Sequence, residues 1–283
     1  MSFNFYGPGA AALLASACLG GAATPALAEG DSAWTFPINV SLVSDYIFRG
    51  QSQTWGKPAL QISAEADHAS GAYVGTAVSN VSDHWLPGAT TELDLYGGYR
   101  NKLTEDIGYD VGLIYYTYPG ANWSDSVFNG FNASKSLNTQ EASLALNYKW
   151  LTFKTGTTLT DYFGWSTNNS PVHGGFNGDS GAGVTGSTRY SSFVEFNAAY
   201  EVVPGWTLNG QIGRQMIRNS TGLDISYYKA GVTRALADGW TVSASYSATN
   251  EPAAYKNFLS LSNGTSSSDI AQNRFFVSVN KAF

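Results

Sequence analysis

Acidic and basic side chains recur at alternate positions along short segments of this sequence, and this spacing limits the chemistry that they could do. Glu65 and Asp67 are two residues apart, as are Glu92 and Asp94. In a β-strand this spacing places both carboxylates of a pair on one face. On the inner face of a closed sheet, such groups would line a passage for polar solutes. The predicted pore-lining residues are Arg49, Glu65, Asp67, Glu92, Asp94, Arg100, Asp110, Glu141, Lys149, Lys154, Arg189, Glu195, Lys229 and Arg274.

The histidines do not form a catalytic or metal-binding pattern. His68, His84 and His173 are scattered, and no pair has the spacing of metal ligands. A hydrolase would need a serine, a histidine and a polar partner on adjacent strand positions. Only His68 lies at the end of a predicted strand, and its alternate neighbours are apolar. The sequence therefore predicts no catalytic residue, no metal site and no cofactor, and it favours a protein that is not an enzyme.

Two loop motifs resemble ligand sites only superficially. Gly181–Gly186 matches G-x-G-x-x-G, but no helical pattern follows it, as a dinucleotide site would require. Asp179 and Asn177 stand near glycines, but they lack the ordered carboxylates of a calcium loop. A flexible, solvated loop is the better interpretation of both.

The elements that would position the charged residues are β-strands. Apolar and polar residues alternate with period two, as between Leu60, Ile62 and their neighbours Gln61, Ser63, and this pattern predicts strands. A soluble β-sandwich would alternate in the same way, so the pattern alone does not decide the fold. Twelve segments show it: 36–48, 60–66, 74–78, 93–99, 107–115, 142–148, 151–159, 194–200, 206–212, 228–232, 240–246 and 275–283.

The lengths of the connections favour a barrel. Tight connections follow the even-numbered segments, at 69–71, 101–106, 150–151, 203–205 and 236–239. Longer ones follow the odd-numbered segments, at 50–57, 79–90, 119–139, 163–188, 219–222 and 250–271, of which only 219–222 is short. This alternation is typical of an up-and-down antiparallel transmembrane β-barrel with short periplasmic turns and long external loops. An even strand count predicts that both termini are periplasmic.

Composition and the first residues agree with an exported membrane barrel. Charged residues are 13% of the chain, about half the usual share, and aromatic residues are 14%. Residues 1–28 carry no Lys, Arg, Asp or Glu and end in Ala26-Leu27-Ala28, which predicts a cleaved signal peptide followed by a barrel over 29–283. Cys18, the only cysteine, falls inside that signal. The net charge of −6 disfavours nucleic acid as a partner.

Aromatic residues gather beside the predicted periplasmic turns. Pro204-Gly205-Trp206 and Asp238-Gly239-Trp240 are near copies that each place a Trp at the base of an outward face. Amphipathic rings prefer the membrane–water interface, so these residues predict the lower aromatic girdle. Tyr99, Tyr109, Tyr148, Trp150, Phe153 and Tyr200 fall at the same level.

The predicted inward-facing charges separate into two groups around the barrel. One group, on the second to sixth segments, is acidic: Glu65, Asp67, Glu92, Asp94, Asp110 and Glu141. The other is basic and consists of Lys149, Lys154, Arg189, Lys229, Arg274 and Arg49. Two opposed walls would create a transverse field that orients polar solutes. The alternative is that the charges pair with each other and fill a narrow barrel.

Several segments resemble one known family. Ser44-Asp45-Tyr46-Ile47-Phe48-Arg49-Gly50-Gln51-Ser52-Gln53-Thr54 and the following Pro58-Ala59-Leu60-Gln61 resemble the opening of the TorF family of porins. Segments 71–81, 92–99 and 112–119 continue the likeness, which covers residues 38–120. The resemblance implies a proteobacterial outer-membrane barrel. It implies no ligand and no catalytic residue.

The sequence thus predicts an outer-membrane porin-like channel for passive diffusion of small hydrophilic solutes. The alternative is a non-conducting structural or surface-interaction barrel. The expected partners are outer-membrane lipid and lipopolysaccharide, the barrel-assembly machinery and small polar solutes. The expected location is the outer membrane of a Gram-negative bacterium.

Overall fold

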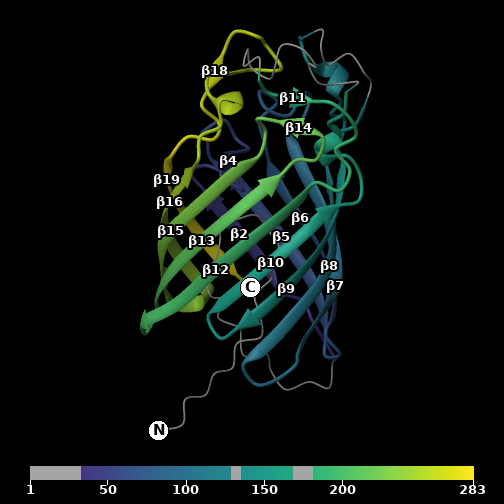
Figure 1. Ribbon diagram of the computed structural model, residues 1–283. Helices are drawn as coiled ribbons and strands as arrows, with labels where there is room; N and C mark the ends of the chain where they lie inside the picture. The colour runs from purple at the N-terminus through teal and green to yellow at the C-terminus, as the bar shows by residue number, and fades with distance from the viewer. Residues whose placement is uncertain (1–32, 129–134, 168–180) are drawn as a thin grey trace.

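A computed structural model describes residues 33–128, 135–167 and 181–283 of the chain (Figure 1). The predicted signal peptide, His173, Asn177 and Asp179 lie outside these residues. Among those described, no helix is long and apolar enough to cross a bilayer.

Twelve antiparallel strands close into one barrel, which confirms the predicted fold class. Each strand pairs with the next one along the chain, and the last strand pairs with the first through Val279↔Leu42 (Figure 1). Closure leaves no free sheet edge, which is what a bilayer requires of a sheet. The strands are β2 (Ile38–Val43), β5 (Ala59–His68), β6 (Ala72–Asn80), β7 (Thr91–Lys102), β8 (Ile107–Thr117), β9 (Thr139–Tyr148), β10 (Leu151–Thr158), β12 (Ser192–Val203), β13 (Trp206–Met216), β15 (Ile225–Ala235), β16 (Trp240–Thr249) and β19 (Arg274–Ala282).

The first strand is interrupted by a proline. The short strand β1 (Trp34–Thr35) pairs with β5 through Trp34↔His68, and β2 pairs with β5 in the same register. Pro37 between them has no N–H to donate to the ladder, although its carbonyl accepts a hydrogen bond of 3.0 Å from the Glu65 amide. The first strand ends at Val43, so its predicted extension to residue 48 is wrong.

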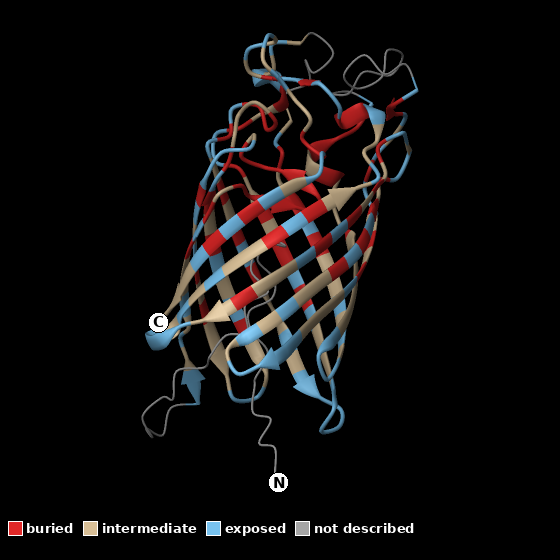
Figure 2. Cartoon of the chain, turned by 90° about the vertical axis from the view of Figure 1, so that its left-hand side faces the viewer, coloured by how far each residue is buried: buried red, intermediate tan, exposed pale blue. Residues whose placement is uncertain are grey.

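Apolar side chains cover the outside of the barrel, and charged ones are buried within it. Leu95, Leu144 and Val242 are 51%, 39% and 40% exposed, whereas Asp94 is 2% exposed. Buried and exposed residues alternate along the strands in Figure 2. A charged residue at the middle of a bilayer would cost about 2–4 kcal/mol, so this sorting suits a barrel that crosses a membrane.

Aromatic rings rest on glycines along the inner wall. A Cβ atom on Gly213 would lie 2.3 Å from ring carbons of Tyr227, its register partner on β15. A Cβ on Gly75 of β6 would lie 2.4 Å from the ring of Tyr96 on β7. Only glycine leaves room for a ring that lies flat against the adjacent strand. These pairs fill the lumen close to the wall and fix the neighbouring strands in register.

Aromatic residues ring the end of the barrel that carries the short turns, as predicted. Trp206 and Trp240 are exposed there. The Arg234 guanidinium lies 5.2 Å from the Trp206 ring centre, and the Lys281 ammonium lies 5.8 Å from that of Trp240. These two cations are on the outward face near strand ends, where long side chains can reach water.

Candidate functional site

The segment that follows the first strand turns into the barrel. Residues 44–57, which we call the plug, contain the hairpin of β3 (Ile47–Phe48) and β4 (Gln51–Ser52). The two turn residues, Arg49 and Gly50, have φ values of 46° and 81°, as a two-residue hairpin turn requires. A Cβ on Gly50 would lie 2.6 Å from the Thr249 side chain, so the turn packs directly against the wall.

Arg49 fixes the tip of the plug to the far side of the barrel. Its guanidinium donates hydrogen bonds of 2.9 and 2.8 Å to the two carboxylate oxygens of Glu141 on β9. It also donates one of 2.6 Å to Gln215 on β13 and stacks on the Phe193 ring at 3.7 Å. Arginine in a left-handed turn costs about 1–3 kcal/mol. The bidentate pair and the stacking offset this cost.

Two further residues fix the base of the plug to other strands. Asp45 lies 3.2 Å from the Arg274 guanidinium of β19 and accepts hydrogen bonds from the Ser52 and Thr54 hydroxyls. The Tyr46 hydroxyl donates a hydrogen bond of 2.6 Å to Glu92 on β7. The plug is therefore bound to widely separated strands of the barrel and spans the lumen.

The long loops cover the plug. We call them the cap: residues 81–90, 118–128, 135–138, 159–167, 181–191, 217–224 and 250–273. Trp85 contacts Trp165, Tyr255 and Phe258, with ring centres 6.0, 6.2 and 4.9 Å apart. All four rings are buried. Figure 2 shows buried residues concentrated at this end of the barrel. The cap therefore has an apolar core of its own.

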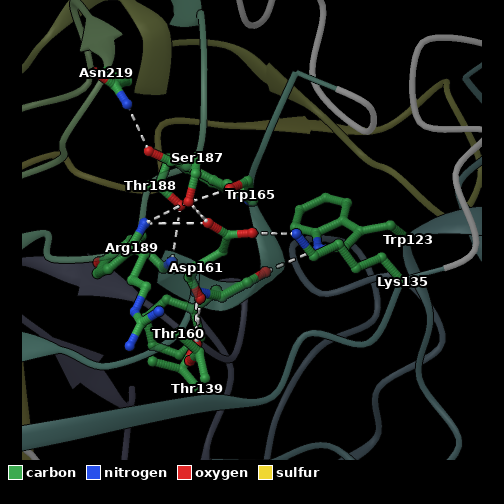
Figure 3. A network of polar contacts seen from close by, with 12 residues as sticks. Trp123, Lys135, Thr139, Thr160, Asp161, Trp165, Ser187, Thr188, Arg189 and Asn219 are labelled. Atoms are coloured by element: carbon green, nitrogen blue, oxygen red, sulfur yellow. Dashed lines mark hydrogen bonds and ion pairs between the residues drawn. The ribbon is translucent and has the colours of Figure 1, made fainter.

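Asp161 joins three segments of the cap (Figure 3). Its carboxylate forms an ion pair with Lys135 and accepts hydrogen bonds of 2.5 Å from the Ser187 hydroxyl and 3.1 Å from the Arg189 amide. Burial tends to raise the pKa of Asp161, but the bonds from Lys135 and Ser187 outweigh burial, so this pKa lies below its usual value of 3.8. Asp161 is therefore ionised at neutral pH.

His84 joins two other parts of the cap but does not form a catalytic triad. Its Nδ1 lies 2.8 Å from the Ser260 hydroxyl and 2.9 Å from that of Ser262. The Asp83 carboxylate lies 3.7 Å from the same nitrogen. A triad needs the acid and the nucleophile on opposite ring nitrogens. The arrangement therefore fits a structural link between residues 81–90 and 250–273.

Towards the short turns, the lumen side chains are less buried, and a second ionic group lies on the wall. Arg100 on β7 has a guanidinium nitrogen 2.5 Å from Glu65 and 3.3 Å from Asp67 on β5. The same guanidinium stacks on the Tyr73 ring at 3.8 Å, and the Tyr73 hydroxyl donates a hydrogen bond of 2.7 Å to Asp110. Arg100 thus offsets much of the acidic wall that the sequence predicts.

The opposite wall carries two lysines. Lys154 on β10 is the register partner of Glu195 on β12, and Lys229 lies buried on β15. Lys154 is half-buried, and within the described part of the chain its ammonium forms no ion pair as short as 4.0 Å. Lys154 is therefore a cation that a solute in this half of the lumen would meet.

Two of the predicted lining residues lie outside the lumen. Lys149 is in the turn between β9 and β10, with a positive φ of 54°, and pairs at 3.5 Å with Asp106 of the adjacent turn. Arg189 is an exposed residue of the cap. Both predictions continued the strand alternation beyond the residue where pairing ends. The other predicted side chains lie on the inner wall, except for Arg49, which the plug carries.

The two predicted walls of charge are largely neutralised. Arg49 and Arg274, assigned to the basic wall, pair with Glu141 and with Asp45 of the plug. The sequence does not reveal this pairing, because residues 44–50 continue the alternation of the first strand and Tyr46 and Phe48 occupy the positions of outward-facing strand residues. Both are buried inside. The strongest available signal was Arg49-Gly50, a dipeptide suited to a tight turn.

The glycine-rich motif has a structural role. Gly183 and Val184 form β11, which pairs with β14 (Ser220–Thr221) inside the cap. No helix follows them, and among the described residues no group of three His, Cys, Asp or Glu side chains could hold a metal ion.

Solved structures with a similar fold are outer-membrane porins and channels. The chain matches the KdgM porin in complex with disordered oligogalacturonate at 9% identity with a TM-score of 0.50, over 87% of this chain and 99% of that one. It matches the NanC porin at 9% identity with a TM-score of 0.47, over 87% and 99%. An outer membrane channel from Pseudomonas putida F1 matches at 10% identity with a TM-score of 0.45, over 91% and 100%. At 9% identity, the similarity to the KdgM porin shows the fold alone.

Sequence comparison identifies the family. A search of curated proteins finds no match. One family profile, described as "Bacterial protein of unknown function (Gcw_chp)", matches residues 27–283, which include every strand of the barrel. The chain therefore belongs to the Gcw_chp family.

Proposed function

We propose that this protein is an outer-membrane porin-like channel for small hydrophilic solutes, closed in the present conformation by the plug. The observation that carries the proposal is the inner wall of the barrel. It carries ionic and polar groups on several strands, with Arg100, Asp110 and Lys154 among the partly exposed ones, between aromatic rings such as Tyr73 and Phe193. A barrel that served only as a scaffold would not need a lumen lined with charge. The similarity to the KdgM fold supports the same proposal.

Closure by the plug is part of this proposal. Polar side chains join the plug to the wall: Asp45, Tyr46 and Arg49 contact it through an ion pair, a hydroxyl and a guanidinium. Such contacts can exchange with water or with a solute at modest net cost. Phe48 also packs against Tyr116 and Phe163, with ring centres 5.8 and 6.0 Å apart, so opening must separate these rings as well. We further propose that the protein is related to the TorF porins and that both of its termini are periplasmic. In the membrane it would contact lipid, and during insertion it would contact the barrel-assembly machinery.

A non-conducting surface barrel is the second candidate. The observation that favours it is the apolar core of the cap, in which Trp85, Trp123 and Trp165 are all buried. A loop region that is packed in this way could present a fixed external surface to another component of the cell envelope.

Conductance in planar bilayers separates these candidates. We would compare the wild-type protein with a variant in which Gly-Ser residues replace 45–56 and shorten the connection between β2 and β5. We expect small or intermittent current steps from the wild type and larger, steady steps from the variant. The control introduces Gly-Ser residues in place of 263–266, a partly exposed stretch of the cap, and should conduct like the wild type. If the folded plug-free barrel carries no current, the channel proposal is wrong and the surface barrel is favoured.

Oligogalacturonate is a suitable first solute for transport measurements, because it is the ligand in the KdgM complex.

A further inference from the structure

An exposed tyrosine at the cap end of the barrel holds two arginine side chains. The guanidinium of Arg189 lies 4.7 Å from the centre of the Tyr190 ring, and that of Arg218 lies 5.7 Å from the same centre. Tyr190 is 47% exposed and has a φ of 68°. A non-glycine residue in this conformation carries strain, and such strain clusters at functional sites.

The three residues lie at the outer rim of the barrel wall. The Tyr190 amide donates a hydrogen bond to the carbonyl of Thr158, the last residue of β10. The Arg218 amide donates one of 3.0 Å to the Ser191 hydroxyl, two residues beyond the end of β13. The cluster therefore sits where β10, β12 and β13 leave the predicted bilayer on the side opposite the short turns.

A third arginine extends the cluster towards the apolar surface. Arg214 is exposed on the outward face of β13, two residues from the exposed Ile212. Ile212 pairs with Phe196 of β12, which is also exposed. A cationic group and apolar groups thus follow each other along one outward face. This order matches an amphiphile whose anionic head group would meet the cation and whose acyl chains would meet the apolar side chains.

Arg189 and Arg218, whose guanidinium groups contact the Tyr190 ring, have no acidic partner in the described residues. Arg214 pairs with Asp224 at 3.3 Å, but neither Arg189 nor Arg218 forms an ion pair there. The nearby carboxylate of Asp161 is engaged by Lys135, Ser187 and the Arg189 amide. Two exposed guanidinium groups that lie within 5.7 Å of one ring centre are suited to bidentate contact with phosphate.

We propose that Arg189, Arg218 and Arg214, which we call the arginine rim, bind the phosphate groups of lipopolysaccharide in the outer leaflet. The acyl chains of the same molecule cover Ile212 and Phe196 below. The Tyr190 ring contacts both the Arg189 and the Arg218 guanidinium through cation–π interactions, which favour the presence of two cations at this place. This inference rests on the outer-membrane location in the proposed function, but it does not depend on conductance.

Binding of lipid A to the purified full-length barrel in detergent tests the proposal. Native mass spectrometry would count bound molecules of bisphosphorylated and dephosphorylated lipid A. We expect the bisphosphorylated form to bind to the wild type and the dephosphorylated form to bind at least about tenfold more weakly, because the charge-assisted hydrogen bonds are lost. Equal binding of the two forms would overturn the proposal, and this comparison needs no variant.

Two variants locate the site. The double variant R189Q/R218Q should bind bisphosphorylated lipid A at least about tenfold more weakly than the wild type. The control is R234Q, because Arg234 makes the same type of contact with Trp206 at the opposite rim; it should bind like the wild type. An unchanged affinity in R189Q/R218Q, or an equal loss in R234Q, would overturn the assignment. Both lipid A binding measurements would keep their meaning even if the barrel carried no current.

Discussion

The guanidinium of Arg49 and the carboxylate of Glu141 form a bidentate pair, at 2.9 and 2.8 Å, between the tip of the plug and the far wall of the barrel. Both side chains are almost fully buried. The pair separates the cap, which is filled with aromatic rings, from the part of the lumen near the short turns, where the wall side chains are polar and partly exposed.

Loss of Arg49 should destabilise the barrel and loosen the plug. In R49Q, Glu141 remains buried without its cationic partner, which typically costs about 3–5 kcal/mol. We expect a lower urea midpoint and more frequent current steps. R49K keeps the charge but not the planar fork, so it should fall between R49Q and the wild type. The control R214Q removes the exposed pair with Asp224 and should change stability by less than about 1 kcal/mol. If R49Q is as stable as the wild type, Arg49 does not hold the plug.

Lys154 should influence ion selectivity once the plug is removed. In the variant that lacks 45–56, K154E replaces a cation of the lumen wall by a carboxylate. We expect the reversal potential in a salt gradient to shift towards cation selectivity. K149E makes the same change of charge in the turn outside the lumen and should produce a much smaller shift. Equal shifts from both variants would mean that charge at the mouth, and not along the wall, governs selectivity.

The ring-on-glycine contacts should tolerate no added methyl group. In G213A the new Cβ would overlap the Tyr227 ring, which would shift the ring or the strand at a cost of about 1–3 kcal/mol. G210A on the same strand is the control, because its Cβ would meet its nearest neighbour, Ala198, at 4.0 Å. It should be neutral to within about 0.5 kcal/mol. The temperature at which each variant loses its compact mobility on a denaturing gel would report both effects.

Asp161 should make the order of the cap depend on pH. Its pKa in the folded protein is lowered below 3.8, so its contribution is fully present above that ordinary value and is lost as the pH falls through the folded value. Hydrogen exchange of residues 159–167, corrected for intrinsic rates, should show weaker protection in D161N than in the wild type at pH 7. The two proteins should become alike as the pH falls through the pKa of Asp161 in the folded protein. A difference that persists unchanged at low pH would exclude the ionised carboxylate as its source.

Sequence alone was sufficient for most of the barrel, because period-two alternation is imposed by the bilayer on every strand. Leu95 and Asp94 are neighbours in the chain, and their opposite exposure follows directly from the strand geometry. The alternation of short and long connections predicted that the strands run up and down in sequence order and close into a barrel. Each of these signals is local, so each can be detected without knowledge of long-range contacts.

The arrangement inside the lumen could not be predicted in this way. Arg49 and Glu141 are 92 positions apart in the chain, and nothing in either segment indicates the other. The alternation wrongly extends the first strand into the plug, because Tyr46 and Phe48 continue the same pattern with their rings turned inwards. The contacts of the cap, such as His84 with Ser260, likewise depend on loops that meet only after the barrel has closed.

The root of the plug lies at the junction where the two ends of the sheet meet. The Ser44 amide donates a hydrogen bond of 2.9 Å to the Val277 carbonyl of β19, and the Val277 amide donates one of 3.0 Å to the Ser44 hydroxyl. These two bonds join the root of the plug to the strand pair that closes the sheet, β19 with β2. A change that opens this strand pair would therefore also release the base of the plug, so closure of the wall and retention of the inner segment depend on the same junction.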